Sequence, residues 1–346
     1  MQFGLFDHVD RNHLSLARQF DERIEYVQLA DQLGYSSYHV AEHHATPLNM
    51  VPVPNVSLGA LAHATKNIRL GALTYLLPLY SPLCLIEELS ILDHLSHGRL
   101  DLGVGRGVSA FELNYHNVDV NTSREVFQEV LDILQNGFTH DRLNHQGKHY
   151  TYKNVPMELK PLQKPFPPIW YPSSNEAGAR YCGSNGFHYV TLGPTAQAAV
   201  RIATYREALK ARGTVAHPLS GLEIGAAGIN RRVVVADSDA EALRIAEPAF
   251  KLWHSSLTKL ARENAGGPVD AVHQIADLKK SIEEGVFIVG SPETVRREVE
   301  KQIEAMNCNF MSIAFCFGAL KISEVKHSVQ LFADEVMAKL PLKAAA

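Results

Sequence analysis

The stretch MQFGLFDHVD, residues 1–10, decides between two α/β architectures. Residues 2–7 are mostly apolar and predict a strand, which ends in Phe6-Asp7-His8 without a glycine-rich turn. A doubly wound dinucleotide-binding sheet carries a G-x-G-x-x-G turn after its first strand, because glycines let the backbone approach a pyrophosphate. The missing turn therefore favours a closed parallel barrel over an open, doubly wound sheet.

Beyond this stretch, apolar runs typical of strands alternate with amphipathic runs typical of helices. Such alternation implies βαβ units and parallel pairing. Eight units predict a TIM (β/α)8 barrel, an α/β fold of about 250 residues that grows with insertions. The predicted strands are residues 2–7, 37–41, 68–77, 99–104, 169–172, 187–192, 223–235 and 310–317. The predicted helices are residues 20–33, 56–65, 82–95, 123–138, 176–184, 196–212, 238–260, 292–306 and 323–339.

No linker divides the sequence, so residues 1–346 are interpreted as a single domain. Two segments are longer than barrel connections usually are. They span about 139–168, rich in His, Pro, Tyr and Lys, and about 262–290, which contains Gly266-Gly267-Pro268. We expect both to be insertions at the C-terminal face of the barrel, over the mouth of the active site.

Composition excludes several classes of function. The chain is 46% hydrophobic and 20% charged, with a formal net charge of −4, so nothing points to a nucleic-acid partner. Its four cysteines form no C-x-x-C pair, which argues against a zinc site or a disulfide framework and for a reducing, cytoplasmic location. The N-terminus does not resemble a signal peptide, and no apolar run approaches the ~18 residues that span a bilayer.

The second predicted strand ends in Glu42-His43-His44, at the face where barrel enzymes carry their active sites. Histidine can act as a general acid or base near neutral pH. An alternative is that one histidine packs in the barrel wall while Glu42 forms a buried ion pair. A metal site is the weaker interpretation, because adjacent strand residues point to opposite faces, and no metal is predicted.

Candidate phosphate-binding groups follow the next two strands. Arg106 stands in a run of glycines, and its guanidinium suits a phosphate. Arg124 lies in the first turn of a predicted helix, where free N–H groups already favour anions, and Thr122 and Glu125 have capping-box spacing. Ser173-Ser174-Asn175 precede the following helix. Each arginine could be solvated and each hydroxyl a simple cap, but all of them converge on one edge of the barrel mouth.

With these strands assembled, the sequence resembles the luciferase-like flavin monooxygenase family. The likeness covers nearly the whole chain in the correct order. It rests on AEHH at 41–44, IRLGALTYLLPLYSP at 68–82, DHLSHGRLDLGVGRG at 93–107, TSRE at 122–125, QGKHYTYKNVPMELKPLQKPFPPIW at 146–170, GSPETVRREVE at 290–300 and FGAL at 317–320.

The resemblance implies a TIM barrel, usually a dimer and here expected to be a homodimer, that takes reduced FMN from a separate flavin reductase. In the family, reduced flavin reacts with O2 to a C4a-hydroperoxide, which oxygenates a small organic substrate such as an aldehyde, ketone or alkane. Two other functions stay open on the same barrel. One is a deazaflavin-dependent dehydrogenase that transfers hydride, and the other is a non-catalytic FMN-binding protein.

The resemblance also implies roles for individual residues. His43 matches the family's catalytic histidine, with Glu42 and His44 as its neighbours. Arg106 and Arg124 match the phosphate-binding arginines, and Ser173, Ser174 and Asn175 match the loop that completes the phosphate cradle. Leu73-Thr74, in an apolar strand suited to a flavin ring, falls where the family has a non-prolyl cis peptide. Glu112 matches an acidic residue after the glycine–arginine turn.

Overall fold

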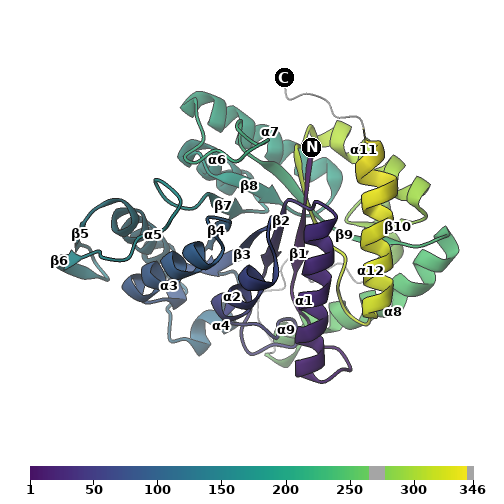
Figure 1. The fold of residues 1–346 in the computed structure, drawn as a ribbon, viewed down its shortest axis with the longest axis horizontal. Coiled ribbons are helices and arrows are strands. Elements are labelled where there is room, and N and C mark those ends of the chain that lie inside the picture. Colours follow the sequence, from purple (N-terminus) through teal and green to yellow (C-terminus); the bar gives the residue numbers. More distant parts are fainter. Residues whose placement is uncertain (265–276, 341–346) are drawn as a thin grey trace.

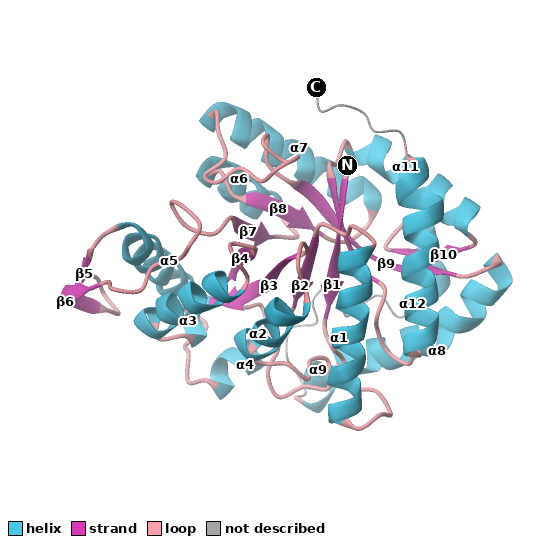
Figure 2. Ribbon diagram, in the orientation of Figure 1, coloured by secondary structure: helices cyan, strands magenta, loops and turns pink. Residues whose placement is uncertain are grey.

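Eight parallel strands form a closed ring at the centre of the computed structural model, which describes residues 1–264 and 277–340 (Figures 1 and 2). Each ring strand pairs with the next, and pairing of β9 with both β8 and β11 closes the circle. The ring consists, in order, of β1 (Gln2–Asp7), β2 (Ser37–Val40), β3 (Arg69–Leu76), β4 (Leu100–Gly105), β7 (Ile169–Pro172), β8 (His188–Thr191), β9 (Ala227–Val235) and β11 (Phe310–Ala314). These are the eight strands that the sequence predicts, so the TIM-barrel fold is confirmed.

Helices cover the outside of the ring (Figure 2). Their buried faces carry the periodic apolar residues that predict them, and prolines begin α2, α3 and α11, where a missing N–H is tolerated. The helices are α1 (Leu16–Gln32), α2 (Pro54–Ala64), α3 (Pro82–Leu95), α4 (Ala110–Tyr115), α5 (Ser123–Thr139), α6 (Glu176–Asn185), α7 (Thr195–Arg212), α8 (Asp239–Leu257), α9 (Lys259–Glu263), α10 (Leu278–Glu283), α11 (Pro292–Met306) and α12 (Ile322–Leu331).

A ninth parallel strand, β10 (Phe287–Gly290), pairs with the second half of β9 and was not predicted. It lies in the segment 262–290, which the sequence analysis interpreted as an insertion because it is longer than usual barrel connections. The described part of that segment also contains α10. Residues 265–276, the remainder of that expected insertion, lie outside the described residues.

The insertion at 139–168 lies differently from the expectation. It forms an antiparallel hairpin, β5 (Arg142–Gln146) and β6 (Thr151–Pro156), beside α5 at the edge of the molecule (Figure 1). It connects the end of α5 to the start of β7, so it leaves from and returns to the N-terminal ends of the strands. The expectation that it overhangs the mouth is therefore wrong, because a helix-to-strand connection of a barrel starts at the opposite end.

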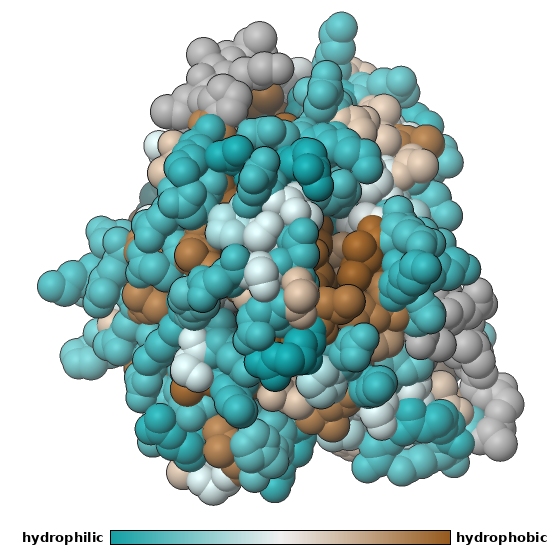
Figure 3. All heavy atoms as spheres, turned by 90° about the vertical axis from the view of Figure 1, so that its right-hand side faces the viewer, coloured by the Kyte–Doolittle hydropathy of each residue, from teal (hydrophilic) through white to brown (hydrophobic). Residues whose placement is uncertain are grey.

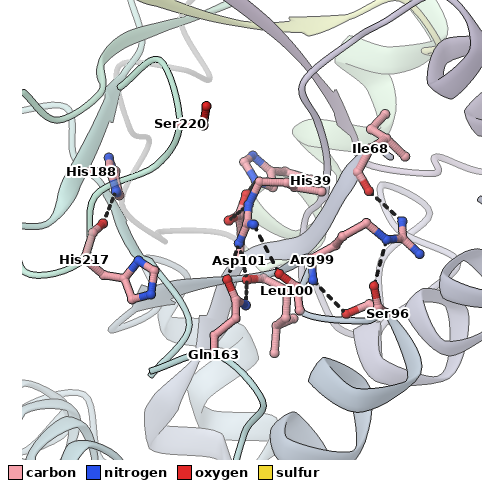
Figure 4. A network of polar contacts seen from close by, with 12 residues as sticks. His39, Ile68, Ser96, Arg99, Leu100, Asp101, Gln163, His188, His217 and Ser220 are labelled. Carbon is pink, nitrogen blue, oxygen red and sulfur yellow. Dashed lines mark hydrogen bonds and ion pairs between the residues drawn. The ribbon is translucent and has the colours of Figure 1, made fainter. Parts of the chain in front are cut away.

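Buried polar side chains tie this connection to the N-terminal end of the barrel (Figure 4). Asp101 accepts hydrogen bonds from His39 Nε2 at 2.9 Å and from Arg69 Nε at 2.7 Å. Burial would raise the pKa of Asp101, but the charges of Arg69 and His39 lower it to about 2. Gln163 Oε1 accepts a hydrogen bond from Arg69 Nη2 at 2.9 Å, and Gln163 Nε2 donates one to the Leu100 carbonyl at 2.8 Å. These hydrogen bonds hold the N-terminal ends of the strands together. A binding site is therefore expected at the C-terminal ends.

The C-terminal ends of the strands point toward the lower edge of Figure 1, where α4 and α9 lie. On the side of the molecule with α8, α11 and α12, hydrophilic side chains cover most of the surface, and hydrophobic ones gather in one hollow (Figure 3). No helix within 1–264 or 277–340 combines the length and the apolar character needed to cross a membrane.

Candidate active site

A cavity of about 440 Å³ opens at the C-terminal ends of the strands. Its size falls within the range of small-molecule and cofactor sites, roughly 300–1,000 Å³. Residues at or just after the ends of β1, β2, β3, β4, β7, β8 and β9 line it, together with side chains from α4, α5, α8 and α9. The barrel therefore gathers groups from most of the chain's length around one space.

Cationic and hydroxyl groups meet on the β4–β7 side of this cavity. Arg106 follows the end of β4, Arg124 stands in the first turn of α5, and both line the cavity with Ser173 and Ser174. Burial raises the pKa of Tyr171, which also lines the cavity, while the charges of Arg124 and Arg106 act in the opposite direction. The groups that the sequence analysis expected to converge thus border one cavity.

Neither arginine has an acidic partner among the residues that the structure describes. The ion pairs found in the described parts of the chain include neither Arg106 nor Arg124, and the one hydrogen bond of Arg106 runs from Nη1 to Ser123 Oγ at 3.5 Å. Two cations beside a cavity without carboxylate partners repel each other unless an anion lies between them. Their arrangement therefore fits a phosphate group such as that of FMN.

Asn175, Ser173 and Ser174, at the start of α6, have different roles. Asn175 lines the cavity, but its side chain caps α6 by accepting from Gly178 N at 2.8 Å. Ser173 Oγ accepts from Asn175 N at 3.3 Å, which shapes the turn. Ser174 is exposed, with no side-chain hydrogen bond to another described residue, and so is the hydroxyl best placed to meet a ligand together with the N–H groups of this helix end.

The capping box expected at Thr122 and Glu125 does not form. Thr122 has helical backbone angles, φ −97° and ψ −9°, and its hydroxyl donates to the Asp119 carbonyl at 3.2 Å. Glu125 instead pairs with Lys148 of the hairpin at 2.6 Å. The helix end is therefore not closed by its own side chains, although Arg124 occupies the expected place.

The glycines of β4 let β3 approach closely, and Gly105 also lines the cavity. A Cβ at Gly103 would lie 2.2 Å from the Ala72 carbonyl oxygen, and one at Gly105 would lie 2.3 Å from Thr74 Oγ1. The peptide bond between Leu73 and Thr74 is cis, and both residues line the cavity. Strand β3 thus forms a close, largely apolar wall beside the phosphate-suited groups.

His43 faces the cavity and is held from behind by Glu112. Its Nδ1 lies 3.1 Å from Glu112 Oε1, which also accepts from His44 N at 2.6 Å. Burial alone would lower the pKa of His43, but the charge and hydrogen bond of Glu112, with the charge of Glu42, raise it. The bond to a carboxylate keeps a proton on Nδ1 and leaves Nε2 as the nitrogen that exchanges protons.

Glu42 and His44 lie differently from His43. The buried Glu42 carboxylate lines the cavity but is occupied by the Tyr80 hydroxyl at 2.9 Å, Leu76 N at 3.0 Å and His44 Nε2 at 2.9 Å. The His44 ring is not part of the cavity lining and packs edge-on against His116. The structure therefore brings His43 to the predicted site and turns His44 away from it.

Replacing Glu112 by glutamine should lower the pKa of His43. The variant removes the charge that opposes the effect of burial, so near neutral pH a smaller fraction of His43 carries a second proton. An NMR titration of the imidazole Cε1–H signal, assigned with the variant His43→Ala, measures this pKa. Glu125→Gln at the exposed start of α5 is the control and should leave it unchanged. An unchanged value in Glu112→Gln would disprove the pairing.

Sequence reasoning missed the residues on the far wall. His8 follows β1, Arg232 lies on β9, and Trp253 comes from α8, and all three line the cavity. Alternation along β9 was the available signal, because every second residue of a barrel strand faces inward. Which of Arg231 and Arg232 faces inward depends on the register of the closed ring, which the sequence does not reveal.

Comparison with known proteins gives a consistent result. The family model described as luciferase-like monooxygenase matches residues 1–306. An uncharacterised protein of Sinorhizobium fredii, y4wF, is 32% identical over 97% of this chain and 96% of its own length. The oxygenase component of the flavin-dependent trigonelline monooxygenase of Acinetobacter baylyi is 31% identical over 54% of this chain and 52% of its own.

Solved structures with the same fold include proteins with different cofactors, FMN in one and F420 in another. Monooxygenase RslO1 of Streptomyces bottropensis superposes with a TM-score of 0.87 at 23% identity, covering 98% of this chain and 99% of its own. The oxygenating constituent of 3,6-diketocamphane monooxygenase of Pseudomonas putida, in complex with FMN, gives 0.80 at 23% identity, covering 99% of both chains. An F420-dependent secondary alcohol dehydrogenase gives 0.75 at 17% identity, covering 98% and 99%.

Proposed function

The chain belongs to the luciferase-like monooxygenase family, and on that premise we propose that it is the oxygenase of a flavin-dependent monooxygenase. It uses reduced FMN from a separate flavin reductase and O2 to oxygenate a small organic substrate. One observation carries the choice of FMN. Arg106 and Arg124, without acidic partners in the described chain, line the same cavity as Ser174, which supports a phosphate site there.

In the proposed reaction, different cavity residues bind the cofactor, exclude water and transfer a proton. Reduced FMN, when bound, supplies the electrons that activate O2 for transfer of one oxygen atom to the substrate. Arg106 and Arg124 hold the phosphate, and the wall formed by Leu73 and Thr74 supports the ring. Apolar side chains such as Phe6 and Leu48 exclude water, which limits side reactions. His43 accepts or delivers a proton at Nε2, with Nδ1 bound to Glu112.

The test begins with binding and proceeds to turnover. FMN and the deazaflavin F420 are titrated separately, and FMN is expected to bind much more tightly. Oxygen consumption is then followed with reduced FMN and a panel of aldehydes, ketones and carboxylic acids, against a control without protein. Preference for F420, with hydride transfer in the absence of O2, would favour the dehydrogenase that shares this barrel. Tight FMN binding without turnover on any substrate would favour the non-catalytic binding protein.

We also propose that the chain is a homodimer, joined through the outer face of α2 and α3. Val53 and Val56 are 51% and 76% exposed, and Ile91 and Leu95 are about half exposed on the neighbouring helix. Clustered apolar side chains on a surface mark contact sites. Val56→Glu should convert a dimer to a monomer at micromolar concentration in sedimentation experiments. Val200→Glu, which changes a similarly exposed valine on the separate helix α7, should not, and a wild-type monomer would refute the proposal.

A further inference from the structure

The wall of the cavity opposite the proposed flavin side carries a buried cation, Arg232. In the ring, β4, β7 and β8 separate β9 from β3 in one direction, and β2, β1 and β11 separate them in the other. The two strands therefore stand as far apart as an eight-stranded ring allows. Arg232 lies on β9, lines the cavity and is only 8% exposed.

The contacts of Arg232 hold it in place without neutralising it. Its guanidinium carbon lies 3.7 Å from the centre of the Trp253 ring, a cation–π contact, and its Nη2 lies 3.4 Å from His8 Nδ1. Its Nε has no hydrogen-bond partner among the described residues. Asp10 is the one carboxylate that acts on its charge, and no ion pair joins the two within the described residues. The guanidinium therefore keeps donors for another group.

The other buried arginines of the described chain differ from Arg232. Arg23 pairs with Asp7 at 2.7 Å, Arg99 donates to the Ile68 and Ala62 carbonyls, and Arg231 donates to Gln302 Oε1 and to the Gly193 carbonyl. Each of these satisfies its charge or its donors with protein oxygens. Arg232 instead contacts an aromatic face and a histidine ring, and it lines the cavity.

A buried cation without an anion is costly to maintain. Burial lowers the pKa of Arg232 to about 9, so the group is still a cation at neutral pH. An anion that enters the cavity would meet a charge that is already desolvated, where electrostatic attraction is strong. A guanidinium fork matches a carboxylate in particular, because two parallel N–H···O bonds can form.

His8 links this cation to the reaction side of the cavity. Burial and the charges of Arg232 and His43 hold the pKa of His8 well below its usual range, so the ring is neutral and its Nδ1 accepts from Arg232. The His8 ring stacks on His43 with 5.6 Å between centroids. A group bound by Arg232 thus lies one aromatic ring away from the proposed proton-transfer residue.

We propose that Arg232 binds the carboxylate of the substrate, and that the chain oxygenates an apolar or aromatic carboxylic acid held between β9 and the flavin side. This inference rests on the proposed function. The apolar part of such an acid contacts Trp253, which packs against the cation, and apolar side chains that line the same cavity, such as Phe6, Leu257 and Leu260. The FMN phosphate has its own arginines on the opposite side, so Arg232 is not needed for it.

The test measures binding and needs no turnover. The FMN-loaded protein is titrated calorimetrically with benzoate and phenylacetate, and with benzamide and phenylacetamide, which have nearly the same shape without the charge. Wild type is expected to bind the acids at least about 30-fold more tightly than the amides, the ratio typical of a buried, hydrogen-bonded charge pair. Arg232→Met should lose this preference, and Arg232→Lys should retain part of it.

Two controls separate the explanations. Arg262→Met removes an exposed positive charge on α9, near the mouth, and should keep the preference for acids, which excludes long-range attraction as its cause. FMN affinity of Arg232→Met should equal that of wild type, which shows that the variant is folded. Equal binding of acids and amides by FMN-loaded wild type, or no binding of either acid, would overturn the inference. Failure of wild type to bind FMN would instead count against the proposed function.

Discussion

Replacing Arg106 and Arg124 together by methionine is expected to weaken FMN binding at least about 100-fold. Each hydrogen-bonded contact with a charged group contributes roughly 1.5–3 kcal/mol, and about 1.4 kcal/mol corresponds to a tenfold change in affinity. The measurement is a flavin fluorescence titration. Neither arginine pairs with a carboxylate of the described chain, so the double substitution breaks no ion pair found there.

Riboflavin provides a sharper comparison for this variant. It has the same ring but no phosphate, so its affinity should be nearly equal in wild type and in the double variant. Arg180→Met, on the exposed side of α6, is the matched control and should leave FMN affinity unchanged. If the double variant binds FMN as wild type does, or loses FMN and riboflavin equally, the two arginines do not form the phosphate site.

Replacing His43 by alanine should reduce the rate of substrate oxygenation about 10²–10⁴-fold, the contribution typical of a positioned general acid or base. FMN affinity should change by less than about threefold, because the proposed phosphate-binding groups Arg106, Arg124 and Ser174 are untouched. Single-turnover measurements with reduced FMN and O2 separate the rate from binding.

A second substitution and a control make the result specific. His43→Gln keeps a polar side chain but cannot exchange a proton near neutral pH, so it should be nearly as slow as alanine. His63→Ala removes an exposed histidine from the last turn of α2 and should behave as wild type. If His43→Ala abolishes FMN binding while any remaining bound enzyme reacts at the normal rate, His43 is a binding residue and not a catalytic one.

Most of the barrel could be predicted from sequence because its strands are buried on both faces and read as short apolar runs between amphipathic helices. β10 could not, because Phe287–Gly290 is too short to show a period and pairs only with the far half of β9. The position of the hairpin at 142–156 also followed from topology and not from composition, since only the order of elements determines which end of the barrel a connection occupies.

The candidate site, too, could be predicted from the sequence only in part. Arg106 and Ser174 follow strand ends and Arg124 lies in the first turn of the next long helix, so a parallel barrel places all three at its C-terminal face. The partnership of His43 with Glu112 joins residues 69 positions apart and depends on how α4 lies over the mouth. His44, next to His43 in sequence, turns to Glu42 because the chain after β2 is no longer extended. Local spacing alone could not separate these two histidines.

The tight contact between β4 and β3 has a consequence for how such a molecule can be altered. At Gly103 and Gly105 even one added methyl group would collide with the neighbouring strand, so evolution and protein engineers alike have almost no freedom there. Arg232, Trp253 and Leu257 lie across the cavity and come from separate elements. Substitutions that change substrate preference are therefore easier to make on that side of the cavity than at the contact between β3 and β4.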